Sequence, residues 1–145
     1  MKAAKVVTDT SVLVVAIMSK RQNYASEVLD MVFSNKIVAY TSDQTKSELI
    51  DVFGREKFKG LLDTDRSQSL LHNYLTKCIK IKINGKLLDI PDKICKDPKD
   101  YPFLAIAEQE KCEYIISLDT KDLLSIREYK ASAIVTPKEF IEVIS

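Results

Sequence analysis

The sequence lacks any apolar stretch long enough for a membrane span. The apolar run from Val12 to Met18 is too short to cross a bilayer. The first residues, Met1 to Val7, contain two lysines and give way to polar residues at Thr8. We therefore expect neither a secretory signal peptide nor a spanning helix, and no association with a membrane.

Cysteine and histidine are also scarce. The three cysteines, Cys78, Cys95 and Cys112, are odd in number, form no CxxC pair and have no histidine beside them, which argues against a zinc site. We interpret them as reduced thiols of a cytoplasmic protein. The single histidine, His72, falls inside a predicted helix away from any strand end, so a surface or packing role is expected.

The sequence has almost no excess of charge. A net charge of +1 is too small to indicate a nucleic-acid-binding protein by itself, so any affinity for RNA must come from local patches. The best candidate is the segment from Lys77 to Lys99, which is otherwise interpreted as a solvated loop and strand edge. Its lysines are Lys77, Lys80, Lys82, Lys86, Lys93, Lys96 and Lys99, against Asp89, Asp92 and Asp97.

What the sequence does contain is typical of an ordinary globular domain. Its 145 residues are 46% apolar and 30% charged, which predicts one domain over residues 1–145. Apolar periodicity predicts strands alternating with helices, and that order is typical of a parallel sheet covered on both faces. We predict an α/β fold, a three-layer α/β/α sandwich with a mainly parallel sheet of four to five strands. The expected strands are 5–8, 37–40, 79–83, 113–118 and 133–135, and the expected helices cover 12–18, 26–33, 43–53, 55–62, 65–78, 98–107, 120–125 and 137 onward.

Acidic residues occur where such a fold would bring them together. Asp9 directly follows the first predicted strand, and Asp119 directly follows the strand predicted to end at Leu118. Ligands of open parallel sheets bind beyond the carboxyl ends of the strands, so these two acids should share one rim. Asp100 begins the helix that precedes the second of these strands, and Glu48 borders the buried face of another helix. The four carboxylates can therefore converge.

Converging carboxylates repel one another and resist joint ionisation unless a cation lies between them. Hard oxygen ligands suit Mg²⁺ or Mn²⁺, which use a few carboxylates together with phosphate oxygens of a substrate. Such a metal can activate water and stabilise the leaving oxygen in phosphodiester hydrolysis. The four acids therefore predict a metal site.

Taken together, five motifs resemble a PIN domain, in particular the VapC-like toxin components of toxin–antitoxin systems. The resemblance runs the length of the chain, and its specificity comes from the joint order of motifs that are weak singly. The motifs are Asp9-Thr10-Ser11-Val12, Ser42 with Glu48-Leu49, Asp97-Pro98-Lys99-Asp100 leading into Phe103 to Ala107, Ile115 to Asp119, and Val135 to Phe140.

The resemblance implies a magnesium- or manganese-dependent endoribonuclease, the toxin component of a type II toxin–antitoxin pair. It also implies an RNA substrate, a cognate antitoxin and a homodimer. The family often has asparagine where this chain has Ser11, so the hydrogen bonding around the metal ligands should differ. By position, the metal-binding and catalytic acids are Asp9, Glu48, Asp100 and Asp119, with Asp97 and Asp122 as auxiliaries.

Each acid also has a purely structural interpretation. Asp97 and Asp119 lie where helix N-caps occur, and for Asp97 the cap is the preferred reading. For Asp122 the structural and functional readings are left open. Two other functions are considered: a PIN-like module that binds RNA or protein without cutting, and an aspartate phosphotransfer domain with Asp9 as nucleophile. The latter requires a second acid close behind the first, where this chain has Thr10 and Ser11.

Overall fold

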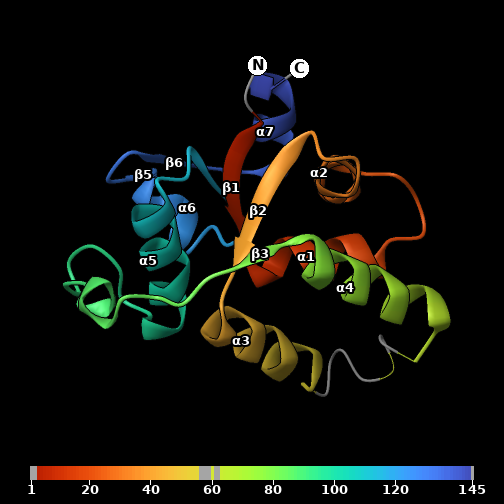
Figure 1. Ribbon diagram of the computed structural model, residues 1–145, viewed down its shortest axis with the longest axis horizontal. Coiled ribbons are helices and arrows are strands. Elements are labelled where there is room, and N and C mark those ends of the chain that lie inside the picture. Colours follow the sequence, from red (N-terminus) through yellow and green to blue (C-terminus); the bar gives the residue numbers. More distant parts are fainter. Residues whose placement is uncertain (1–2, 56–59, 61–62, 145) are drawn as a thin grey trace.

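A six-stranded sheet runs through the middle of the protein (Figure 1), in the order β3-β2-β1-β4-β6-β5. The computed structural model describes residues 3–55, 60 and 63–144. Every strand pair is parallel except β5 with β6, as the alternation of strands and helices predicts. The strands are β1 (Ala4–Thr8), β2 (Ile37–Thr41), β3 (Ile79–Lys80), β4 (Tyr114–Ile116), β5 (Glu128–Tyr129) and β6 (Ser132–Val135).

The strands differ from the prediction in number and in length. The sheet has one strand more than the four to five expected, because β5 consists of two residues and is too short to carry a periodic pattern. The strand expected over 79–83 ends at Lys80, although the Ile81 N–H still donates to the Thr41 carbonyl at 2.8 Å. β4 ends at Ile116, so Asp119 follows it after two intervening residues.

Helices cover both faces of the sheet. Figure 1 shows α5 and α6 on one side of β1 and β2, with α2 and α4 on the other. The helix expected over 55–62 falls largely on residues 56–59 and 61–62, which lie outside the described residues. The helices are α1 (Thr10–Met18), α2 (Tyr24–Phe33), α3 (Asp43–Phe53), α4 (Asp65–Lys77), η2 (Gly85–Leu88), η3 (Pro98–Asp100), α5 (Tyr101–Glu110), α6 (Leu123–Ile126) and α7 (Pro137–Ile144).

Two apolar layers hold the helices to the sheet. Successive residues of a strand point to opposite faces, so Val6 packs into the layer beneath α1, α2 and α4, and Val7 packs into the layer beneath α5 and α6. Ile116 and Ile115 of β4 divide in the same way. This confirms the predicted three-layer α/β/α arrangement.

The carboxyl ends of the central strands form one rim, as predicted. β1 pairs with β4, with Thr8 opposite Ile116, and the Asp9 N–H donates to the Ile116 carbonyl at 3.0 Å. Asp9 and Asp119 therefore follow adjacent strands at the same edge of the sheet.

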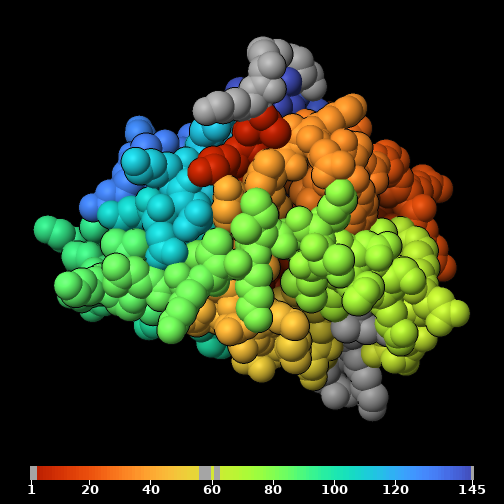
Figure 2. All heavy atoms as spheres, in the orientation of Figure 1, coloured from red at the N-terminus to blue at the C-terminus, as the bar shows by residue number. Residues whose placement is uncertain are grey.

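Figure 2 shows the segment after α4, in green, crossing the face in view between α3 and β1. Among the described residues, no helix is long and apolar enough to span a bilayer.

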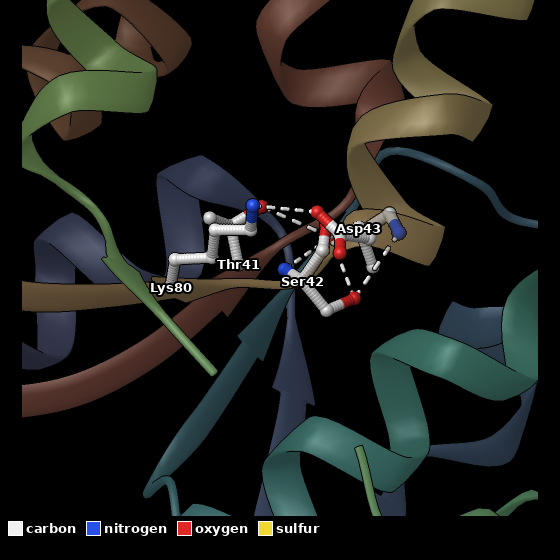
Figure 3. A network of polar contacts seen from close by, with 5 residues as sticks. Thr41, Ser42, Asp43 and Lys80 are labelled. Carbon is white, nitrogen blue, oxygen red and sulfur yellow. Dashed lines mark hydrogen bonds and ion pairs between the residues drawn. The ribbon is translucent and has the colours of Figure 1, made fainter. Parts of the chain in front are cut away.

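Helix α3 begins at this rim with a capping box that starts at Ser42 (Figure 3). The Ser42 Oγ accepts from the Thr45 N–H at 3.2 Å, and the Thr45 Oγ1 accepts from the Ser42 N–H at 2.9 Å, so each residue caps the other. The Lys80 Nζ lies 2.7 Å from the Asp43 Oδ1 and joins β3 to the start of α3. This cap fixes the helix that carries Glu48.

Candidate active site

The four acids singled out in the sequence line one cavity at this rim, with a volume of about 480 Å³. They come from different segments, since Asp9 follows β1, Glu48 lies within α3, Asp100 precedes α5 and Asp119 follows β4. We call this the acidic cavity. Its polar lining is Asp9, Thr10, Ser11, Glu48, Arg55, Asp97, Lys99, Asp100 and Asp119, and its apolar lining is Val14, Val15, Val52 and Phe103.

Asp9 is buried and held on both oxygens. Its Oδ1 accepts from the Ser11 N–H at 2.9 Å and from the Ser11 hydroxyl, and its Oδ2 accepts from the Ser117 hydroxyl. These serines also bind the backbone beyond β4, because the Ser11 Oγ accepts from the Leu118 N–H and the Ser117 Oγ accepts from the Asp119 N–H, both at 2.9 Å. The network fixes Asp9 against the segment that carries Asp119.

The environment of Asp9 opposes its ionisation. Burial, with a smaller contribution from the charge of Asp119, raises the pKa of this carboxyl to about 6. The hydrogen bonds from Ser11 and Ser117 act in the other direction because they stabilise the carboxylate. A nearby cation would therefore favour the charged form.

Asp100 has one oxygen, Oδ2, that is buried and has no hydrogen-bond partner among the described residues. Burial is the main cause of the rise in its pKa to about 8, followed by the negative charges of Asp119 and Asp97. An ionised oxygen left in this state is costly, since buried polar groups are normally paired. This oxygen is the clearest indication that the cavity takes a cation.

Two further acids lie beside Asp100. Carboxylate oxygens of Asp97, Asp100 and Asp122 all lie within 4.8 Å of one another, and we call these residues the acid trio. Asp97 also has the capping role that its sequence position predicts, because its Oδ1 accepts from the Lys99 N–H at 3.0 Å. Hence the two acids considered auxiliary in the sequence are the ones that gather around Asp100.

Glu48 faces the cavity from the middle of α3 and is partly buried. Burial raises its pKa, whereas the positive charges of Lys99 and Arg55 lower it. The Arg55 Nη2 lies 4.0 Å from the Glu48 Oε1. Sequence reasoning did not assign these two cations to the site; the only signal was that Lys99 precedes Asp100 in its motif, and nothing in the sequence pointed to Arg55.

The donor set suits a hard divalent cation. Carboxylate oxygens predominate in the cavity, no cysteine or histidine is among its lining residues, and Asp100 supplies an unpaired buried oxygen. His72 lies exposed on α4, as expected. The residues that could hold such an ion are Asp9, Glu48, Asp100 and Asp119, with Asp97 and Asp122 beside Asp100.

Comparisons with known proteins agree with this architecture. The family model described as PIN domain matches residues 5–121. An uncharacterized protein of Methanocaldococcus jannaschii is 29% identical over 147 aligned residues, which cover 95% of this chain and 90% of that protein.

Three solved structures share the fold. PAE2754 from Pyrobaculum aerophilum matches with a TM-score of 0.66 at 14% identity, covering 98% of this chain and 97% of that chain. FitAcB from Neisseria gonorrhoeae matches with a TM-score of 0.57 at 18% identity, covering 92% and 98%. VapBC2 from Rickettsia felis, solved bound to a DNA fragment from its promoter, matches with a TM-score of 0.57 at 16% identity, covering 91% and 98%.

Proposed function

Because the chain belongs to the PIN domain family, whose model matches residues 5–121, we propose that it is a metal-dependent endoribonuclease that hydrolyses phosphodiester bonds of RNA. The observation that carries the proposal is the acidic cavity. Four carboxylates from four segments line this one cavity, and Asp100 keeps a buried oxygen without a partner among the described residues. A merely structural cluster of acids would pair that oxygen.

We assign Asp9, Glu48, Asp100 and Asp119 as the residues that hold Mg²⁺ or Mn²⁺. A divalent ion bound there would supply a polarised water as nucleophile and charge stabilisation for the scissile phosphate. Asp97 and Asp122, which lie next to Asp100, are auxiliaries of the same site.

The protein's own residues orient and balance these charges. Ser11 and Ser117 hold both oxygens of Asp9 by hydrogen bonds. The Oδ1 accepts twice from Ser11, whereas the Oδ2 accepts only from Ser117 and keeps a second lone pair for a cation. Ser11 fills the role for which the family often has asparagine, since its hydroxyl bonds both Asp9 and the Leu118 N–H. Lys99 and Arg55 line the cavity and can bind the non-bridging oxygens of the phosphate.

The biological setting is part of the proposal. The names of two of the similar structures, FitAcB and VapBC2, together with the VapC-like sequence motifs, support a toxin of a type II toxin–antitoxin pair and a cognate antitoxin as partner. Action in the cytoplasm is a further part of the proposal. We also expect a homodimer, which size-exclusion chromatography with light scattering would test.

An RNase assay tests the proposed activity. Purified protein is incubated with total RNA in manganese, in magnesium and in EDTA. We expect cleavage with either metal and none in EDTA. Binding of RNA without cleavage under all conditions would favour the non-catalytic alternative, and cleavage that persists in EDTA would contradict the metal site.

A further inference from the structure

A second cavity adjoins the acidic cavity. Its volume is about 640 Å³, and it lies between the loop before η3 and the segment that runs from α6 to β5. We call it the lysine cavity. Its lining is Asp92, Lys93, Ile94, Cys95, Lys96, Lys121, Asp122, Ser125, Ile126, Glu128, Tyr129 and Lys130.

The two cavities meet at the acid trio. Asp122 lines the lysine cavity, whereas Asp97 and Asp100 line the acidic cavity, and oxygens of all three lie within 4.8 Å of one another. Lys96, which lines the lysine cavity, directly precedes Asp97. A nucleic-acid strand whose phosphodiester lies at the acids would therefore continue into the lysine cavity on one side.

The lysines of this cavity have little to neutralise them. Lys93, Lys96 and Lys121 are exposed, and their amino groups have no hydrogen-bond or ion-pair partner in the described part of the chain. The Lys130 Nζ lies 5.7 Å from the centre of the Tyr129 ring. Because the ring is neutral, this contact leaves the positive charge of Lys130 unpaired.

Three acids also line the cavity, so four lysines face three carboxylates. Asp122 belongs to the acid trio. Asp92 accepts a hydrogen bond from the Tyr101 hydroxyl at 3.5 Å, which leaves its negative charge in place. The four lysines outnumber the three acids of the lining, and the balance favours an anionic ligand.

Other lysines of the basic segment differ in this respect. Lys80 is paired with Asp43 (Figure 3), and Lys77 donates to the Asn35 Oδ1 at 2.6 Å. The segment from Lys77 to Lys99 is therefore not one continuous patch. Its end near Lys93 and Lys96 combines free charge with a cavity next to the acids.

We propose that the lysine cavity binds the unpaired RNA strand that flanks the cleaved phosphodiester, with the lysines on its phosphates and the apolar side chains of Ile94 and Ile126 against a base. This inference rests on the proposed function. The volume lies in the range of small-ligand pockets and admits single nucleotides rather than a duplex. An acidic segment of a protein partner would also be attracted by lysines, but the shared wall of acids favours a ligand whose phosphates continue from one cavity into the other.

The test is a binding titration that does not depend on cleavage. A fluorescein-labelled oligouridylate of about twelve nucleotides is titrated with the full chain in EDTA, at several salt concentrations, and followed by fluorescence anisotropy. We expect the double variant Lys93→Gln/Lys96→Gln to bind about tenfold more weakly. The magnitude of the negative slope of log K against log salt should fall by about 1.4. The control is Lys36→Gln/Lys111→Gln, which removes the same charge from exposed positions before β2 and β4, at the opposite rim. It should change the affinity by less than about twofold.

A crosslinking experiment locates the bound strand. With 4-thiouridine in the oligonucleotide, crosslinks should fall on residues 92–96 or 121–130. Equal affinity of wild type and the lysine variant, or crosslinks confined to other segments, would overturn the inference. So would a polyglutamate peptide of the same length that binds these lysines more tightly than the RNA.

The cleavage assay keeps this inference separate from the proposed function. If wild type cleaves RNA with manganese but the lysine variant binds and cleaves normally, the nuclease assignment stands and the lysine cavity is excluded. If RNA binding depends on the lysines but no condition gives cleavage, the cavity stands as an RNA site and the nuclease assignment fails. Melting curves of both variants check that each one is folded.

Discussion

At the scale of single residues, Asp9 is the centre of the site because its carboxylate is both buried and fixed by two serines. Asp9→Asn keeps the size of the side chain but removes the charge that a metal requires. We expect cleavage of RNA to fall by on the order of a thousandfold with the fold intact. Asp89→Asn, at an exposed position outside both cavities, is the matched control and should cleave normally. A wild-type rate of RNA cleavage in Asp9→Asn would contradict the mechanism. Asp122→Asn is expected to lower this rate less than Asp9→Asn does.

Ser117 is the residue that joins the two acids. It is fully buried, donates to Asp9 and accepts from the Asp119 N–H. Ser117→Ala should lower the free energy of unfolding by about 1 to 3 kcal/mol, because it leaves the buried Asp9 without the Ser117 donor and the partly buried Asp119 N–H without an acceptor. It should also weaken manganese binding by about tenfold or more, since a ligand loses its orienting partner.

Urea denaturation and calorimetric titration with manganese measure the two effects of Ser117→Ala. The control is Ser34→Ala, at an exposed position whose hydroxyl makes only a 3.4 Å contact with the Met31 carbonyl. A Ser117→Ala variant that loses stability but binds manganese as wild type does would show that the serine is structural only.

At the scale of elements, the N-terminal cap of α3 holds the helix that carries Glu48. In this cap Ser42, which is labelled in Figure 3, and Thr45 bind each other. Ser42→Ala should reduce the free energy of unfolding by about 1 to 2 kcal/mol, because it removes the cap of a buried helix start. It should also reduce cleavage, since α3 loses its fixed position at the rim.

The capping box of α7 provides the comparison for Ser42→Ala. Thr136 and Glu139 bind each other in the same way, with distances of 2.9 and 3.1 Å, and neither residue lines the acidic cavity. Thr136→Ala should cost about 1 kcal/mol of stability and leave cleavage unchanged. Equal losses of activity in the two variants would mean that stability alone, and not the position of Glu48, explains the effect of Ser42→Ala.

At the scale of the whole molecule, the clustered acids couple stability to pH and to metal. The folded-state pKa values of Asp9 and Asp100, about 6 and about 8, lie above the ordinary value of 3.8. The protonated form is therefore favoured in the folded state, so the stabilisation is present at low pH and is lost as the pH rises from about 4 to about 8. The melting temperature of the metal-free protein should fall across this interval.

A divalent cation should reverse this loss. Manganese that binds only the folded state raises stability in proportion to the logarithm of its excess over the dissociation constant. Thermal melts at neutral pH, with and without millimolar manganese, measure the effect, and Asp9→Asn should show a smaller shift than wild type. No shift in wild type, or an equal shift in both proteins, would mean that these acids are caps and surface charges.

The sequence by itself determined the alternation of strands and helices and the edge of the sheet at which Asp9 lies. Apolar periodicity is a local property, so it indicated the alternation of strands and helices, and the position of Asp9 after a buried strand placed it at the carboxyl edge of a parallel sheet. The caps of α3 at Ser42 and of α7 at Thr136 are equally local, because a cap depends only on residues within one turn. The two-residue strand β5 was missed because it exists only through pairing with β6.

Only the tertiary structure decided which distant side chains share a wall. Asp97 and Asp122 belong with Asp100 because the loop before η3 packs beside α6, a contact between segments far apart in the chain that no local pattern encodes. The same packing separates Lys93 and Lys96, which line a cavity, from Lys80, which is neutralised by Asp43 on α3. Charge along a sequence is additive, whereas its effect on a ligand depends on which charges the fold places together and which ones it pairs.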